Sequence, residues 1–173
     1  MLKAETLVAQ LKSLGITHAV GLSDTSLARV FSLCQEDPEI KVVPVCREGE
    51  AFAIAAGLCV GGKTPVVMVQ NTGFLESGDA IRGTLVNMKL PVLILISYRG
   101  YQSLLNGTGV TNAPGKNSWI DSAATFLEPT LGAWGLPYVT VESDGELNRI
   151  AEARELAVQR SGPAAVLVIG SCG

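Results

Sequence analysis

Two glutamates at the start of an apolar helix are the side chains best placed for acid–base chemistry. A short apolar strand over Lys41–Val45 leads into Cys-Arg-Glu-Gly-Glu, and an unbroken run of apolar residues and glycines follows. That run is too long for a typical strand and predicts a buried helix with Glu48 and Glu50 in its first turn. At about 100° per residue, an apolar stripe lies within a quarter-turn of Glu48, formed by Ala51, Phe52, Ala55 and Cys59.

The same periodicity separates the two carboxylates. Glu48 heads the apolar stripe, while Glu50 points to the opposite side of the helix. The plainest interpretation gives both the same role, because a carboxylate in the first turn complements the positive end of the helix dipole. Spacing alone favours that interpretation, since glutamates are common in first turns.

The elements that position these residues alternate regularly between strand and helix. Strands are predicted at Thr17–Leu22, Lys41–Val45, Pro65–Gln70, Pro91–Ser97, Pro137–Val141 and Pro163–Ile169. Helices are predicted at Lys3–Leu14, Ser26–Gln35, from Glu48 onward, at Glu76–Met88, at Trp119–Trp134 with a break near Pro129, and at Glu146–Arg160. Apolar strands alternating with helices predict an α/β fold, a doubly wound three-layer αβα domain with a six-stranded, mainly parallel sheet. We expect residues 1–173 to form this single domain.

Polar residues follow several of the predicted strands. Asp24 comes after the first strand and fits a helix cap. Asn71-Thr72-Gly73 comes at the carboxyl end of the third strand, where open parallel sheets bind ligands, although it also fits a tight turn. Arg99 follows the fourth strand, where its guanidinium could bind a phosphonate or sulfonate or simply face solvent.

A long loop begins at Arg99. The predicted loop spans 99–118 and contains four glycines and three asparagines. Loops of this length in compact domains are usually functional or mobile. We therefore expect this segment to close over a substrate or a partner.

Composition excludes several classes of function. The net charge is −3 with no basic run, which argues against nucleic acid, and no apolar stretch reaches the length of a membrane span. The four cysteines show no CxxC pair, and His18 is the only histidine, so a metal cluster is not expected and the chain fits a reducing cytoplasm. Hydrophobic residues make up 47% of the chain, which suggests that a partner covers part of its surface.

The stretch around Glu48 resembles the pyrimidine-binding domain of thiamine diphosphate enzymes. In that family a glutamate follows a strand and a glycine comes nine positions later in an alanine-rich helix, as Glu48 and Gly57 do here. Gln70-Asn71-Thr72-Gly73-Phe74 and Ser97-Tyr98-Arg99-Gly100 are similar to the phosphonopyruvate and sulfopyruvate decarboxylase branch. The resemblance covers nearly the whole chain and is strongest through residue 100.

The resemblance implies roles for individual residues. Glu48 would activate the cofactor's aminopyrimidine, which requires a poorly solvated carboxyl group. Asp24 would either face the reacting carbon or only cap the following helix. Asn71, Thr72 and Gly73 would contact thiamine diphosphate, and Arg99 with Asn71 would bind the substrate.

The family's diphosphate anchor is missing from the sequence. Family members hold the diphosphate through Mg²⁺ with a Gly-Asp-Gly stretch and a distant asparagine, and neither Gly78-Asp79-Ala80 nor Ser143-Asp144-Gly145 matches it. The resemblance therefore implies an α-type subunit of a 2-oxo acid decarboxylase, with Mg²⁺ held by a β-type partner in a hetero-oligomer such as α2β2. The alternatives are a subunit of another thiamine diphosphate enzyme, such as a carboligase, or a catalytically silent αβ domain that binds a partner.

Overall fold

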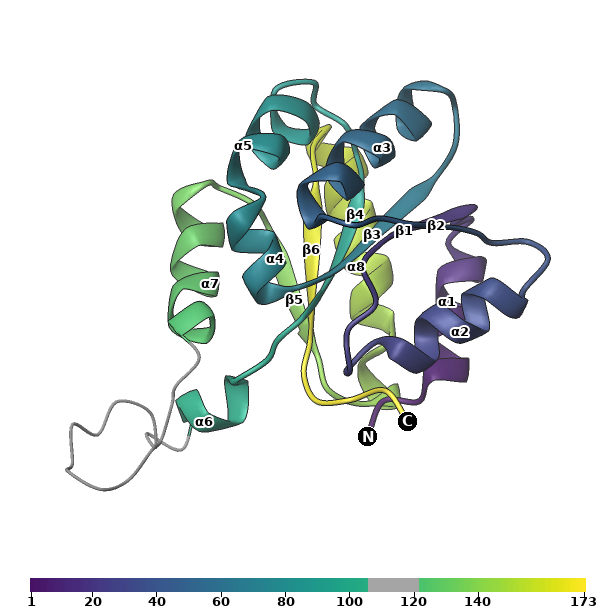
Figure 1. Cartoon of the computed structure of the whole chain (residues 1–173), viewed down its shortest axis with the longest axis vertical. Helices are drawn as coiled ribbons and strands as arrows, with labels where there is room; N and C mark the ends of the chain where they lie inside the picture. The colour runs from purple at the N-terminus through teal and green to yellow at the C-terminus, as the bar shows by residue number, and fades with distance from the viewer. Residues whose placement is uncertain (106–121) are drawn as a thin grey trace.

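Six parallel strands form one sheet at the centre of the chain (Figure 1). The computed structural model describes residues 1–105 and 122–173. The strands are β1 (His18–Gly21), β2 (Lys41–Pro44), β3 (Pro65–Gln70), β4 (Leu93–Ser97), β5 (Tyr138–Val141) and β6 (Ala164–Val168). Their spatial order is β2-β1-β3-β4-β6-β5, and every neighbouring pair is parallel. The prediction of an α/β fold with a six-stranded parallel sheet is confirmed.

Helices cover both faces of this sheet. They are α1 (Ala4–Ser13), α2 (Ala28–Glu36), α3 (Glu48–Val60), α4 (Asn71–Glu76), α5 (Gly78–Ile81), α6 (Tyr101–Leu105), α7 (Ser122–Ala133) and α8 (Asn148–Arg160). A π-helical turn at Arg82–Val86 follows α5, and a 3-10 turn at Asp144–Glu146 precedes α8. Helices α1, α2 and α8 lie on one face, and α3, α4, α5 and α7 on the other (Figure 1).

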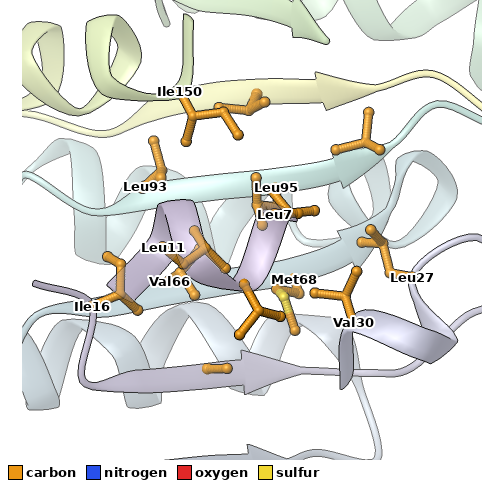
Figure 2. Close-up of a cluster of buried hydrophobic side chains, with 14 of the residues drawn as sticks. Leu7, Leu11, Ile16, Leu27, Val30, Val66, Met68, Leu93, Leu95 and Ile150 are labelled. Atoms are coloured by element: carbon orange, nitrogen blue, oxygen red, sulfur yellow. The ribbon is translucent and has the colours of Figure 1, made fainter. Parts of the chain in front are cut away.

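Each face of the sheet carries its own apolar core. Val66 and Met68 of β3 belong to the core under α1, α2 and α8, which Figure 2 shows in close-up. Val67 and Val69 of the same strand belong to the core under α3, α4, α5 and α7. This alternation explains why the central strands β3, β4 and β6 are continuous apolar runs, because nearly all of their residues are buried on one face or the other.

The two ends of the chain lie side by side (Figure 1), where the Ala4 N–H donates to the Gly173 carbonyl at 3.1 Å. No helix in the described ranges is long and apolar enough to cross a membrane.

The prediction of one helix over Glu76–Met88 is wrong: helical structure begins earlier, at Asn71, and is divided into α4, α5 and a π-helical turn. Helix α4 begins directly after β3, at Asn71, where a tight turn was the alternative. Helix α4 ends at Glu76, and Ser77 separates it from α5. The Ser77 hydroxyl donates to the Gly73 carbonyl at 2.6 Å, and the same carbonyl accepts from the Ser77 N–H at 3.1 Å. The Thr84 hydroxyl donates likewise to the Ala80 carbonyl at 2.6 Å within the π-helical turn.

Two further predictions need correction. The break near Pro129 does not occur, since α7 runs through it to Ala133. Pro129 removes the hydrogen bond to the Thr125 carbonyl, but both residues are exposed, so water can satisfy that group. The predicted loop at 99–118 begins with the short helix α6, and its remainder from 106 onward lies outside the described residues, as does the predicted helix start at Trp119.

Candidate functional site

The connections that follow β1 and β3 leave the sheet on opposite faces. After β1 the chain enters α2, which packs in the core with α1 and α8, and after β3 it enters α4, which packs in the core with α3 and α7. Such a reversal opens a crevice at the carboxyl ends of parallel strands, where ligands bind in open α/β sheets. The loop residues singled out in the sequence therefore gather at this edge.

Asn71 joins the ends of two strands. Its side chain is fully buried at the start of α4, and its Nδ2 donates to the Arg99 carbonyl at 2.9 Å. Its Oδ1 accepts from the Thr72 N–H at 3.1 Å. The residues after β3 and β4 are thus held together, with Thr72 and Arg99 both exposed at this edge.

Asp24 uses both carboxylate oxygens within the chain. Its Oδ1 accepts from the Leu27 N–H at 2.8 Å, which is a helix-capping bond just ahead of α2. Its Oδ2 accepts from the hydroxyl of Ser97, a fully buried residue at the end of β4. The bond to Leu27 agrees with the predicted capping role. The bond to Ser97 links the loop after β1 to the end of β4.

Glu48 lies directly against the backbone of Gly73. Glu48 opens α3 after β2, and Gly73 lies in α4 after β3. A Cβ atom at Gly73 would come within 2.3 Å of Glu48 Cγ and within 2.4 Å of Glu48 Oε1. Only glycine leaves room for this carboxylate, so the approach of the Glu48 side chain explains why position 73 is a glycine.

Glu50 and Glu48 differ in their partners. Glu50 is exposed, and its Oε2 accepts from the Cys46 N–H at 3.3 Å, so it satisfies the backbone ahead of its own helix. Glu48 is half-buried, and within the described ranges its carboxylate has no hydrogen bond or ion pair. The neighbouring Arg47 pairs instead with Glu76. The Glu48 carboxylate therefore has hydrogen-bonding capacity that the described residues do not use.

The wall beside Glu48 is apolar, as the predicted stripe requires. Ala51, Phe52 and Ala55 are fully buried, while Cys59 is only partly buried. The ring of Phe52 meets the ring of Phe74 edge to face, with 6.4 Å between centroids. This wall restricts the approach of water to the carboxylate from the side of the core.

A second hydrogen-bonded group lies behind the end of β4, and the sequence analysis did not find it. The hydroxyl groups of Tyr98 and Tyr138 donate to the two oxygens of Glu128, at 3.0 and 2.7 Å. Burial, and then the bond to Glu128, raises the pKa of Tyr98, and the bond to Glu128 raises the pKa of Tyr138 to about 12. The ring of Tyr98 also packs against the ring of Tyr101 at the start of α6, with 4.9 Å between centroids. These residues are far apart in the chain, so no local pattern could identify them.

The edge thus collects Asp24, Glu48, Asn71, Gly73 and Arg99, although no hydrogen bond in the described ranges links Glu48 to Asp24. The arrangement fits one end of the expected cofactor, because it offers an unpaired carboxyl group in an apolar setting. The described residues contain no group of three or more His, Cys, Asp or Glu side chains suited to a metal ion.

Comparison with known proteins agrees with this geometry. Residues 1–115 match the family described as the thiamine pyrophosphate enzyme N-terminal TPP binding domain, thiamine pyrophosphate being another name for thiamine diphosphate. The match includes Glu48, Gly73 and Arg99.

The similar proteins include decarboxylases. Sulfopyruvate decarboxylase subunit alpha of Methanococcus maripaludis is 28% identical over 89% of this chain and 86% of its own length. The subunit of the same name from Methanothermobacter thermautotrophicus is 34% identical over 56% of this chain and 59% of its own length. Phosphonopyruvate decarboxylase of Streptomyces viridochromogenes is 31% identical over 58% of this chain, but only 25% of that protein is covered.

A solved structure has the same fold. The 2-oxoglutarate:ferredoxin oxidoreductase of Magnetococcus marinus superposes with a TM-score of 0.72 over 99% of this chain and 29% of its own, at 17% identity. At that identity the likeness establishes the fold alone. Together with the family match over most of the chain, it leads to one conclusion: this chain belongs to the thiamine pyrophosphate enzyme family and carries its N-terminal TPP binding domain.

Proposed function

We propose that this chain is the α-type subunit of a thiamine diphosphate-dependent decarboxylase that acts on a 2-oxo acid with an anionic tail, such as sulfopyruvate or phosphonopyruvate. The observation that carries the proposal is the unpaired Glu48 carboxylate, held over Gly73 at the carboxyl edge of the sheet. The names of the similar proteins support the substrate class.

Glu48 is the residue proposed to act on the cofactor. When bound, thiamine diphosphate supplies the electron sink for the loss of CO₂ from a 2-oxo acid. The Glu48 carboxyl oxygen would hold a proton against a ring nitrogen of the aminopyrimidine, and the apolar wall at Phe52 would keep water from competing for it. Gly73 fixes the direction of this side chain because nothing larger fits beneath it.

The hydrogen bonds around Glu48 support the proposed binding roles. Asn71 holds the Arg99 backbone at the crevice, where we propose that the Arg99 guanidinium binds the sulfonate or phosphonate. Thr72 is exposed at the same place and would contact the cofactor together with Asn71 and Gly73. Asp24 is held by Ser97 and Leu27 close to where a substrate would react, so its role combines helix capping with the proposed contact to substrate.

A partner subunit completes the proposed site. The relatives named subunit alpha imply a second kind of subunit, and the Gly-Asp-Gly motif that holds the diphosphate in this family is missing from the sequence. We propose that a β-type subunit with the Gly-Asp-Gly motif holds Mg²⁺ and the diphosphate, in an assembly such as α2β2. One cofactor molecule would then bridge the two kinds of subunit.

Reconstitution tests this proposal. The chain, a β-type partner, Mg²⁺ and thiamine diphosphate are combined, and CO₂ release is measured from sulfopyruvate, phosphonopyruvate and pyruvate. We expect release only when both subunits are present, and faster release from the two substrates with anionic tails. Release from pyruvate alone would contradict the role of Arg99, and a reconstituted assembly that binds cofactor but reacts with none of them would contradict the decarboxylase assignment.

A further inference from the structure

Three basic side chains from separate segments meet at the amino edge of the sheet, at the opposite end of the strands from Glu48. His18 begins β1, Lys41 begins β2, and Lys63 lies just ahead of β3. His18 pairs in register with Lys41 on one side and with Pro65 on the other. Paired residues on parallel strands point to the same face, so the imidazole and the Lys41 ammonium group are neighbours.

These side chains line a depression of about 560 Å³. Its remaining lining comes from the end of α2, the turn into β2 and the start of β1, namely Thr17, Gln35, Pro38, Glu39, Ile40 and Val42. The depression is separate from the carboxyl edge, and none of the residues assigned to the decarboxylase site lines it.

The two lysines have no counter-charge of their own. Within the described ranges neither Lys41 nor Lys63 forms an ion pair, and both are exposed. Glu39 is the only acidic residue in the lining, and its carboxylate is bound to Lys12 at 2.8 Å. Lys12 also binds Asp37 at 2.7 Å, so the nearby carboxylates are drawn toward Lys12. An anion bound between the two lysines would therefore meet no competing carboxylate in the lining.

The hydrogen bonds of His18 leave one ring nitrogen for a ligand. His18 Nδ1 lies 2.9 Å from the Thr17 hydroxyl, and the Thr17 oxygen also accepts from the Thr64 N–H at 3.1 Å. His18 Nε2 has no hydrogen-bond partner within the described ranges. Burial, and then the positive charges of Lys63 and Lys41, lowers the pKa of His18, and an anion that offset those charges would raise it.

We propose that this depression is a binding site for a small anion of the phosphate class, held by Lys41, Lys63 and His18. The two ammonium groups supply charge, and His18 Nε2 supplies a third donor once the anion favours its protonated form. The lining is polar on its rim and open to solvent, so an anion with two or more charges suits it better than an apolar ligand. The proposal is independent of the decarboxylase assignment, because it uses none of that site's residues.

The single histidine makes the test specific. The full chain is labelled with ¹³C-histidine, alone and assembled with an unlabelled partner, and the His18 pKa is read from its ring resonance during a pH titration. The probe is inorganic pyrophosphate, compared with sodium chloride at the same ionic strength. We expect pyrophosphate to raise the His18 pKa by about half a unit or more beyond the effect of chloride.

Two variants supply the controls. In Lys41→Gln/Lys63→Gln the His18 pKa should rise without any anion, since both positive neighbours are gone, and the response to pyrophosphate should disappear. Lys89→Gln removes an exposed lysine elsewhere and should keep the full response. A pyrophosphate shift no larger than that of chloride, or one that persists in the double variant, would overturn the proposal.

Discussion

The two edges of the sheet hold unpaired charge of opposite sign. At the carboxyl edge, hydrogen bonds satisfy Asp24 and Asn71, while the Glu48 carboxylate is left without a partner in the described ranges. At the amino edge, Lys12 engages the acidic side chains, and Lys41 and Lys63 are left without one. At each edge, neighbouring polar side chains are hydrogen-bonded or ion-paired within the chain, and a charged side chain beside them has no such partner in the described ranges. Such charges are where a ligand adds most, because it meets no competing protein partner.

Glu48→Gln should have the largest effect. The amide keeps the shape of the side chain but cannot hold an acidic proton against a ring nitrogen, so turnover of the reconstituted enzyme should fall by about 10²–10⁴-fold. Melting temperature should change little, since the carboxylate makes no hydrogen bond to the described chain. The matched control is Glu50→Gln in the same helical turn. Its turnover should stay within a few-fold of wild type, because the glutamine carbonyl can still accept from the Cys46 N–H. Equal behaviour of the two variants would make Glu48 a helix-dipole residue.

Gly73→Ala should have the next largest effect. The new methyl group would overlap the Glu48 side chain at 2.3–2.5 Å, so the carboxylate must move and turnover should fall about 10–100-fold. In a Glu48→Gln background the same substitution should cost little more activity, since both changes disable one group. Gly83→Ala is the matched control, because a Cβ there meets nothing within 4 Å. Additive losses in the double variant would contradict the pairing of Glu48 with Gly73.

Asn71→Ala should mainly reduce stability. It removes the buried bond to the Arg99 carbonyl, which should cost about 1–3 kcal/mol of unfolding free energy. Chemical denaturation measures this cost, and KM for the anionic substrate should rise with it because Arg99 is no longer positioned. Thr72→Ala, at an exposed position, should stay within about 0.5 kcal/mol of wild type. An Asn71 variant as stable as wild type would show that the bond does not hold the two strand ends together.

The strands were predictable because buried strands appear in the sequence as continuous apolar runs. Pro65–Gln70 was predicted with the observed bounds, and β4 begins two residues inside the predicted Pro91–Ser97. Helix boundaries around residues 71–88 were not, because the chain changes from α-helix to a π-helical turn within one apolar pattern. The Ser77 and Thr84 hydroxyl groups bond back to carbonyls four residues earlier, which can bend a helix and leaves no mark in the apolar periodicity.

The site was predictable only in part, for a related reason. Their positions at the ends of strands pointed to Asn71 and Arg99, and the pairing of β3 with β4 places the Asn71 side chain against the Arg99 carbonyl. The contact between Glu48 and Gly73 joins two crossover helices, and the links from Tyr98 and Tyr138 to Glu128 join two strands to α7. Such contacts depend on how the layers pack, which local spacing does not encode.

Alkaline pH tests the tyrosine pair at Glu128, with a smaller effect. Tyrosine ordinarily has a pKa of about 10, and Tyr138 in the folded chain has one of about 12. Below about pH 10 both states keep the proton, whereas between pH 10 and 12 only the folded state keeps it, so stability falls as pH rises through this window. Tyr138→Phe should show a shallower fall in denaturation experiments at pH 9, 10 and 11. Equal slopes in wild type and in Tyr138→Phe would contradict the role of the Glu128 bond.

Calorimetry of the chain without a partner tests the central claim most directly. That claim is that this chain contributes the carboxyl group that acts on the aminopyrimidine, while another subunit anchors the diphosphate. Thiamine diphosphate is titrated with and without Mg²⁺ into the Lys41→Gln/Lys63→Gln variant, so that the proposed anion site at the amino edge does not contribute. We predict no tight binding until the β-type partner is added, and then binding that requires Mg²⁺. Tight, Mg²⁺-dependent binding to the isolated chain would contradict the shared site and would require a diphosphate anchor within this chain.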